Sequence, residues 1–148
     1  MTPVYADTGL ICSLYAPDAH TEAAISFIEQ ETAPVAFTWL HQVEFRNAMR
    51  LRIFRREITS EQRDAGFRFL RSDVNAGVFC SVDVSQDAVL TETERLSAQF
   101  TEVVGARSLD ILHVAMALVL GVERFAGFDH RQNRLARNAG LKIAHGTD

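Results

Sequence analysis

The sequence predicts an α/β protein with a mainly parallel central sheet and helices on both faces, built as one domain over residues 1–148. Short apolar segments alternate along the chain with longer segments in which apolar residues recur at helical spacing. This alternation is typical of parallel sheets whose strands are joined by crossover helices. A length of 148 residues suits one core, and no linker rich in Pro, Gly or Ser divides the chain.

The first half of the chain predicts two strands and four helices, with capping residues or prolines near their ends. In order they are a strand over 3–7, a short helix over 9–15, a helix capped by Asp18 or Thr21, a strand over 35–38, a helix over about 40–56, and a helix opened by Thr59 or Ser60. One stripe of the 40–56 helix combines apolar side chains with polar ones at helical spacing: Leu40, Val43, Glu44, Asn47, Ala48 and Leu51. Glu44 is therefore expected on or beside the apolar face of this helix.

The second half of the chain predicts three more strands and three more helices. In order they are a strand over 78–82, a helix capped by Asp83 or Ser85 that runs to about residue 100, a loop over 105–108, a helix over 109–120 capped by Ser108, a strand within 123–128, a helix over 129–139, a strand over 141–144, and a tail over 145–148. The 109–120 helix is apolar nearly all round, which predicts a central and buried position.

Charge is distributed unevenly along the chain. The net charge of −4 argues against wholesale electrostatic binding of nucleic acid. Residues 46–71, however, contain eight arginines against three acids. This basic series can be a solvated helix face, a track for an RNA backbone, or a docking surface for an acidic partner segment.

The remaining bulk features predict a cytoplasmic protein that does not enter the membrane. The longest apolar run, over 114–122, is too short to span a bilayer. Asp7 interrupts the apolar start of the chain, which argues against a signal peptide. Cys12 and Cys80 lie in apolar surroundings without CxxC spacing, which predicts two reduced and buried thiols.

Four acids occupy positions where a strand passes into a helix, or the first turns of a helix. They are Asp7, Glu44, Asp110 and Asp129. Because the carboxyl ends of parallel strands open onto one crevice, these side chains are expected to meet there. Carboxylates in such proximity repel one another unless a cation neutralises them, and oxygen ligands suit Mg²⁺ or Mn²⁺. The sequence therefore predicts a metal-dependent phosphoryl-transfer enzyme, most simply a nuclease.

Several segments resemble PIN domains, in the right order and over essentially the whole chain. Asp7 and Thr8 resemble the opening of these domains, and Glu44 matches their second acid. The segment 107–115 resembles the third-acid region of VapC-type toxins, and the segment 127–141 resembles their closing region. The resemblance implies a PIN-like three-layer sandwich and a Mg²⁺- or Mn²⁺-dependent endoribonuclease. It also implies the toxin of a type II toxin–antitoxin pair, inhibited by a cognate antitoxin and commonly a homodimer.

One position departs from this pattern. The family usually has Thr or Ser two residues before its last acid, and here that position is Gly127. A hydroxyl that could orient a metal-bound water or a phosphate is therefore missing beside Asp129.

Each of the four acids has a predicted role at the metal and a plainer alternative. Asp7 and Asp110 are the expected direct ligands; alternatively, Asp7 caps a helix and Asp110 complements a helix dipole. Glu44 can hold the metal through water or help to activate the nucleophile, or pair with Arg46 or Arg50 on its own helix. Asp129 can hold a second ion or its water shell, and can also cap the last helix.

Supporting roles are predicted for four neighbours of these acids. Thr8 and Ser108 can bond a carboxylate or a substrate oxygen, or serve as plain caps. Asn47, one turn beyond Glu44, can orient it. Arg107 can pair with a scissile phosphate. His113, on the apolar helix, is predicted to be a core histidine with satisfied ring nitrogens.

Other functions with acidic or phosphate-binding pockets fit the sequence less well than a nuclease. A receiver-type signalling domain needs a late lysine at its acidic pocket, whereas Lys142 lies in the final predicted strand. A haloacid-type phosphatase wants an acid at position 9, which is Gly9, and no Gly-rich phosphate loop is present. A catalytically silent PIN-fold binding module remains the main alternative.

Overall fold

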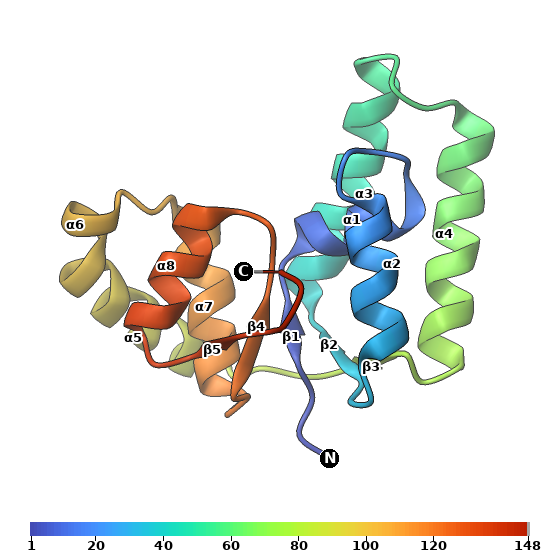
Figure 1. Cartoon of the computed structure of the whole chain (residues 1–148). Coiled ribbons are helices and arrows are strands. Elements are labelled where there is room, and N and C mark those ends of the chain that lie inside the picture. Colours follow the sequence, from blue (N-terminus) through green and yellow to red (C-terminus); the bar gives the residue numbers. More distant parts are fainter. Residues whose placement is uncertain (148) are drawn as a thin grey trace.

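The computed structural model describes residues 1–147 and places a five-strand parallel arrangement between two groups of helices (Figure 1). The elements are β1 (Tyr5–Ala6), α1 (Thr8–Tyr15), α2 (Thr21–Gln30), β2 (Val35–Phe37), α3 (Trp39–Phe54), α4 (Ser60–Asn75), β3 (Phe79–Ser81), α5 (Gln86–Leu96), a π-helical turn η1 (Ser97–Thr101), α6 (Glu102–Val104), α7 (Ser108–Val119), β4 (Arg124–Ala126), α8 (His130–Asn138) and β5 (Lys142–Ile143). Asp148, the end of the predicted tail, lies outside the described residues.

The strands pair in parallel throughout, as the alternation of strands and helices predicted. One part of the sheet has the order β1–β4–β5, and the other pairs β2 with β3. A parallel bridge between Val4 and Val35 joins the two parts, and the backbone N–H of Ala36 donates to the carbonyl of Val4 over 2.9 Å. The strand order is therefore β3–β2–β1–β4–β5, with the first strand at the centre.

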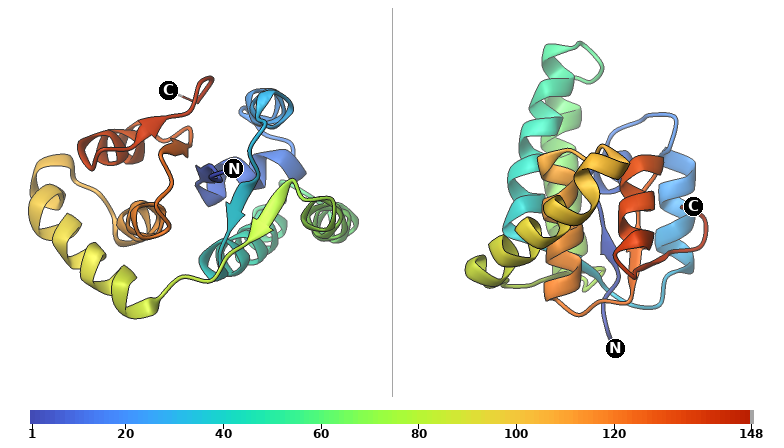
Figure 2. Two further views of the ribbon diagram at one scale, coloured as in Figure 1. Left: turned by 90° about the horizontal axis from the view of Figure 1, so that it is seen from below. Right: turned by 90° about the vertical axis from the view of Figure 1, so that its left-hand side faces the viewer.

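Alternation along β1 divides the core into two clusters, one on each face of the sheet. Tyr5 is fully buried in a cluster with α5, α7 and α8. Val4 and Ala6 point the other way, into a cluster with α1, α2 and α4. Figures 1 and 2 show these helices on either side of the strands, with α3 and α4 projecting beyond the sheet as a hairpin.

The long helix α3 corrects one prediction. Its buried side chains are Leu40, His41, Phe45 and Met49. Val43 and Leu51, which were placed on the apolar stripe, are 60% and 39% exposed. Tertiary packing decides which face of α3 is buried. Phe45 and Met49 pack into the cluster with α1 and α4. The predicted stripe instead lines a pocket, through Glu44, Asn47, Ala48 and Leu51.

Two helix boundaries also differ from prediction. Helix α5 ends at Leu96 and passes through η1 into α6, where Gly105 closes the segment with a φ of 73°. Helix α7 begins at Ser108 itself, so the prediction that Ser108 caps it was wrong. Arg107 occupies the cap position, and its backbone N–H donates to the Asp110 carboxylate over 3.3 Å.

Burial confirms the predictions for the apolar helix and for Cys12, and contradicts the one for Cys80. The apolar helix α7 is central, with Ile111 and the run from His113 to Ala117 buried. Cys12 is buried, and burial raises the pKa of its thiol to about 12, whereas Cys80 is half-buried and not buried as predicted. Within residues 1–147, no helix is long and apolar enough to cross a membrane.

Candidate metal site and its pocket

Asp7 lies where β1 ends and α1 begins, and it is the most buried of the four acids. Its backbone N–H donates to the carbonyl of Ala126 over 2.9 Å, which fixes it beside β4. Its Oδ1 caps α1 by accepting the backbone N–H of Leu10 over 2.8 Å, so the capping role is real. Within residues 1–147, no hydrogen bond reaches Oδ2. That oxygen is available to another ligand.

The electrostatics of Asp7 reflect burial next to other acids. Its exposed fraction is only 8%. Desolvation raises the pKa of this carboxyl to about 6, and the charges of Asp129 and Asp110 add to the increase, while the Leu10 bond and His113 oppose it. The charged form of Asp7 is therefore unfavourable without a neighbouring cation.

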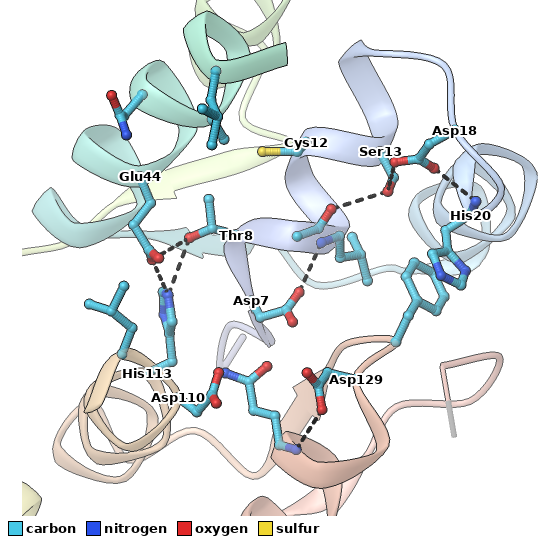
Figure 3. A pocket seen from close by; sticks show the side chains of 18 of the residues that line it. Asp7, Thr8, Cys12, Ser13, Asp18, His20, Glu44, Asp110, His113 and Asp129 are labelled. Carbon is cyan, nitrogen blue, oxygen red and sulfur yellow. Dashed lines mark hydrogen bonds and ion pairs between the residues drawn. The ribbon is translucent and has the colours of Figure 1, made fainter. Parts of the chain in front are cut away.

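Glu44 is held by two side chains from other elements. The Thr8 hydroxyl donates to its Oε1 over 2.8 Å, and Nε2 of His113 bonds the same oxygen (Figure 3). Burial opposes ionisation, but the hydrogen bonds from His113 and Thr8 hold the pKa of Glu44 below its ordinary value. Arg46 and Arg50, considered as partners of Glu44, lie instead over the Phe67 ring at 4.5 and 5.5 Å from its centroid.

Arg107 connects the other two acids. Its Nε donates to Oδ2 of Asp110 over 3.3 Å, and its Nη2 lies 3.7 Å from Oδ2 of Asp129. Asp129 also caps α8, because its Oδ1 accepts the backbone N–H groups of Arg131 and Gln132 over 2.9 and 3.1 Å. The Arg107 side chain is 73% exposed, so it can leave these carboxylates at little cost.

All four acids line one pocket of about 710 Å³. Thr8, Asn47 and Arg107 also line it, and so does His113, which the sequence placed simply in the core. Ser108 is exposed and is not among the described residues that line the pocket. Asn47 faces the pocket, but the hydrogen bonds to Glu44 come from Thr8 and His113. The structure thus brings together seven of the eight predicted residues.

The donor atoms fit a hard divalent cation that keeps part of its water shell. The acids offer only oxygen ligands, which Mg²⁺ and Mn²⁺ prefer. Within residues 1–147, no three His, Cys, Asp or Glu side chains are close enough to hold one ion together. Mg²⁺ is commonly bound through one or two carboxylates and several waters, so Asp7 with one neighbour suffices.

A buried oxygen next to Asp7 strengthens this fit. Oδ1 of Asn133 has no hydrogen-bond partner among the described residues, although Asn133 is 1% exposed. Its amide group donates to the carbonyls of Gly127 and Thr147 over 2.8 and 2.9 Å, which fixes the orientation of Oδ1. This oxygen and Oδ2 of Asp7 both lie within 3.5 Å of the point where a Cβ on Gly127 would stand. Two unbonded oxygens in one place favour a cation or a bound water.

An aromatic pair that the sequence did not single out forms another wall of the pocket. The rings of His20 and Phe128 stack with centroids 4.7 Å apart and planes 9° apart. The loop before α2 is pinned, since Asp18 accepts from Arg52 over 2.6 Å, from Ser13 over 2.8 Å and from the His20 backbone over 2.8 Å. Figure 3 shows His20 and Asp129 near one side of the pocket. The contact joins residues 108 positions apart, so local sequence patterns carry no signal for it.

Comparisons with known proteins support the fold. No protein-family model and no curated protein matches the sequence. Among solved structures, FitAcB from Neisseria gonorrhoeae is 14% identical, with a TM-score of 0.64 over 97% of each chain. VapBC2 from Rickettsia felis, solved bound to a DNA fragment from its promoter, is 12% identical, with a TM-score of 0.66 over 95% of this chain and 96% of that one. At such identities the similarity concerns architecture, and the predicted PIN-like α/β fold is confirmed.

Proposed function

We propose that the protein is a Mg²⁺- or Mn²⁺-dependent endoribonuclease that acts as the toxin of a type II toxin–antitoxin pair. One observation carries this proposal: four acids from the β1–α1 junction, α3, α7 and the β4–α8 connection line one pocket. The raised pKa of Asp7 supports it, because desolvation and its acidic neighbours make a bound cation the natural counter-charge.

In the proposed hydrolysis of a phosphodiester bond, the residues of the pocket have different roles. A bound divalent ion would neutralise the phosphate and lower the pKa of a water molecule. Asp7 and Asp110 would hold the ion, and Asp129 would hold its water shell or a second ion. Glu44, fixed through Oε1, would orient the attacking water with Oε2. Arg107 would exchange its carboxylate partners for a substrate phosphate.

Two features favour a single-stranded nucleic acid as the substrate. The stack of His20 and Phe128 offers ring surface at the pocket wall, on which an unpaired base can stack. Arg52 and Arg55 line the same pocket and continue the basic series of α3 toward it. A groove with both cations and aromatic rings is typical of single-strand binding.

The toxin–antitoxin assignment rests on two kinds of likeness. The segments 107–115 and 127–141 resemble VapC-type toxins, and the fold is shared with FitAcB and with VapBC2. The expected partner is an antitoxin whose acidic or amphipathic segment occupies the crevice, with an arginine near the carboxylates. A cytoplasmic homodimer is the expected form of the protein.

The deciding experiment is cleavage of a mixed pool of structured RNAs by the purified protein. It is run with Mg²⁺, with Mn²⁺ and with chelator, beside the Asp110→Asn variant. We expect cleavage that requires both the metal and Asp110, with the variant folded like the parent by circular dichroism. Equal cleavage by Asp110→Asn, or cleavage in chelator, would refute the assignment of the site.

A catalytically silent binding module is the second candidate, and the position of Arg107 favours it. Its guanidinium pairs with both Asp110 and Asp129, so the chain itself offsets one of the two negative charges of these acids. Such a module would bind Mn²⁺ weakly and cleave nothing while free of partner. The receiver-type alternative loses support, because Lys142, the one lysine of the sequence, is not among the residues that line the pocket.

A further inference from the structure

We infer that Tyr5, His113 and Glu44 form a hydrogen-bonded chain that holds Glu44 in one orientation, with His113 as the positioning residue of the pocket. The inference rests on the proposed function, because it assigns a role toward the metal site. It concerns residues that the four-acid pattern does not include.

The geometry links the core to the pocket in two steps. The hydroxyl of Tyr5, which is fully buried in the central strand, lies 2.7 Å from Nδ1 of His113. On the other side of the ring, Nε2 of His113 bonds Oε1 of Glu44. The three residues come from β1, α7 and α3, so the hydrogen bonds connect three elements that surround the pocket.

Hydrogen-bond bookkeeping fixes the positions of the protons. Oε1 of Glu44 accepts the hydroxyl proton of Thr8, so this oxygen has no proton to donate to His113. The Thr8 hydroxyl also lies 3.2 Å from Nε2 of His113, but it donates its one proton to Oε1 of Glu44. His113 must therefore donate from Nε2, and in the neutral ring Nδ1 then accepts the proton of Tyr5.

An alternative partner for the Tyr5 hydroxyl is weak. Sδ of Met116 lies 3.6 Å from the hydroxyl oxygen, and a thioether is a poor acceptor. The Tyr5 bond to Nδ1 is therefore the stronger one, and it keeps the Nε2 proton directed at Glu44.

His41 shows what a purely structural histidine looks like in the same core. It is fully buried, and its Nε2 donates to the carbonyl of Ala6 over 2.7 Å. Its Nδ1 accepts the backbone N–H of Thr38 over 3.0 Å. The Thr38 hydroxyl also lies 2.9 Å from Nδ1, so His41 bonds backbone groups and one neutral hydroxyl of its own helix cap. His113 differs because it bonds side chains of other elements, and one of them is an acid of the pocket.

The carboxylate of Glu44 is therefore held through only one of its two oxygens, among the described residues. Within residues 1–147, both donors reach Oε1 of Glu44, and none reaches Oε2. A carboxylate anchored through one oxygen presents the other in a fixed direction. Partners that orient a ligand in this way commonly contribute about 10–100-fold to metal affinity or activity.

The test measures Mn²⁺ affinity by electron paramagnetic resonance on the full chain, without RNA. His113→Leu removes the donor, whereas His113→Gln keeps an amide N–H that can reach Glu44. Tyr5→Phe removes only the distal hydroxyl. Its matched control is Tyr15→Phe, which removes the half-buried hydroxyl that bonds Asp73 between α1 and α4, away from the pocket.

The expected pattern is graded. His113→Leu should weaken Mn²⁺ binding by about 10–100-fold, His113→Gln should recover most of that loss, and Tyr5→Phe should weaken binding by a smaller factor. Tyr15→Phe should lower thermal stability while leaving Mn²⁺ affinity unchanged. Wild-type affinity in both Tyr5→Phe and a folded His113→Leu would overturn the inference.

A spectroscopic readout separates this inference from the proposed function. Long-range ¹H–¹⁵N NMR of the metal-free protein should show His113 protonated at Nε2 and bare at Nδ1, with the Nδ1 signal shifted in Tyr5→Phe. A wild-type ring protonated at Nδ1 and unprotonated at Nε2 would refute the hydrogen-bonded chain, independently of the Mn²⁺ affinities. If that NMR pattern is found but the wild type binds no Mn²⁺, the proposed function fails, and so does the role of His113 toward a metal.

Discussion

Gly127 makes room for the carboxylate of Asp7: a Cβ on residue 127 would stand 3.0 Å from Oδ2 of Asp7 and 3.1 Å from its Cγ. Contacts this short between a Cβ and another heavy atom are rarely tolerated in folded proteins. Where the PIN-like pattern has a hydroxyl side chain, this protein lets Asp7 and the fixed Oδ1 of Asn133 face the same small space. The departure at position 127 therefore concerns Asp7 more directly than Asp129.

Gly127→Ala should displace the Asp7 carboxylate. We expect a loss of about 1–3 kcal/mol in the free energy of unfolding, because overpacking a filled interior costs this much. Weaker Mn²⁺ binding should accompany it, since Oδ2 would be pushed from its position. Urea unfolding in chelator and Mn²⁺ titration measure the two effects separately.

Gly9→Ala is the matched control. A Cβ on Gly9 would meet the same carboxylate at an ordinary 3.6 Å from Oδ1. Gly9 also lies inside α1, where alanine is favoured over glycine by about 0.5–1 kcal/mol. The control should therefore be stabilised and bind Mn²⁺ normally. Equal behaviour of the two variants would show that space at residue 127 does not matter.

Asp7→Asn should stabilise the metal-free protein at alkaline pH. The folded protein holds the Asp7 proton more tightly than the unfolded chain does, since the pKa rises from 3.8 to about 6 on folding. The ionised Asp7 thus lowers stability above pH 6, by about 2–3 kcal/mol, and this penalty fades as the pH falls toward 4. The asparagine variant should gain this amount at pH 8 and nothing near pH 4.

Thermal or urea unfolding in chelator across that pH range provides the measurement. Saturating Mg²⁺ should reverse the order at pH 8, because the cation stabilises only the carboxylate. A variant that is less stable than the parent at pH 8 in chelator would contradict the strain attributed to the Asp7 charge.

Phe128→Leu should weaken binding of single-stranded RNA while leaving the acids in place. Loss of one base–aromatic stack costs about 1–3 kcal/mol, or ~5–150-fold in the dissociation constant. Fluorescence anisotropy with a labelled oligonucleotide in the Asp110→Asn background avoids cleavage during the measurement. Phe69→Leu serves as the control, because Phe69 is 60% exposed on α4 and outside the pocket. Equal losses in both variants, or the same loss with duplex RNA, would argue against a stacking site.

The order of elements and the identity of the acids follow from local features of the sequence. Short apolar strands, helical periodicity and capping residues act over a few positions, so β1, α4, α7 and α8 lie within a residue or two of prediction. Asp7 and Asp129 cap the helices that follow β1 and β4, and those helices bring both acids to the same end of the sheet. Parallel topology gathers Asp7, Glu44 and Asp129, which lie at or shortly after strand ends, whereas Asp110 follows α6 and depends on how α7 packs.

What the sequence by itself determined is thus the α/β architecture and the acidic pocket. Only the tertiary structure decided which face of α3 is buried, that His113 bonds Glu44, that Arg107 bridges Asp110 and Asp129, and that His20 stacks on Phe128. The physical reason is the distance along the sequence over which each interaction acts. Periodicity and capping act within one or two helical turns, whereas these contacts depend on how separate elements pack, and the partners of His113 lie 69 and 108 positions away.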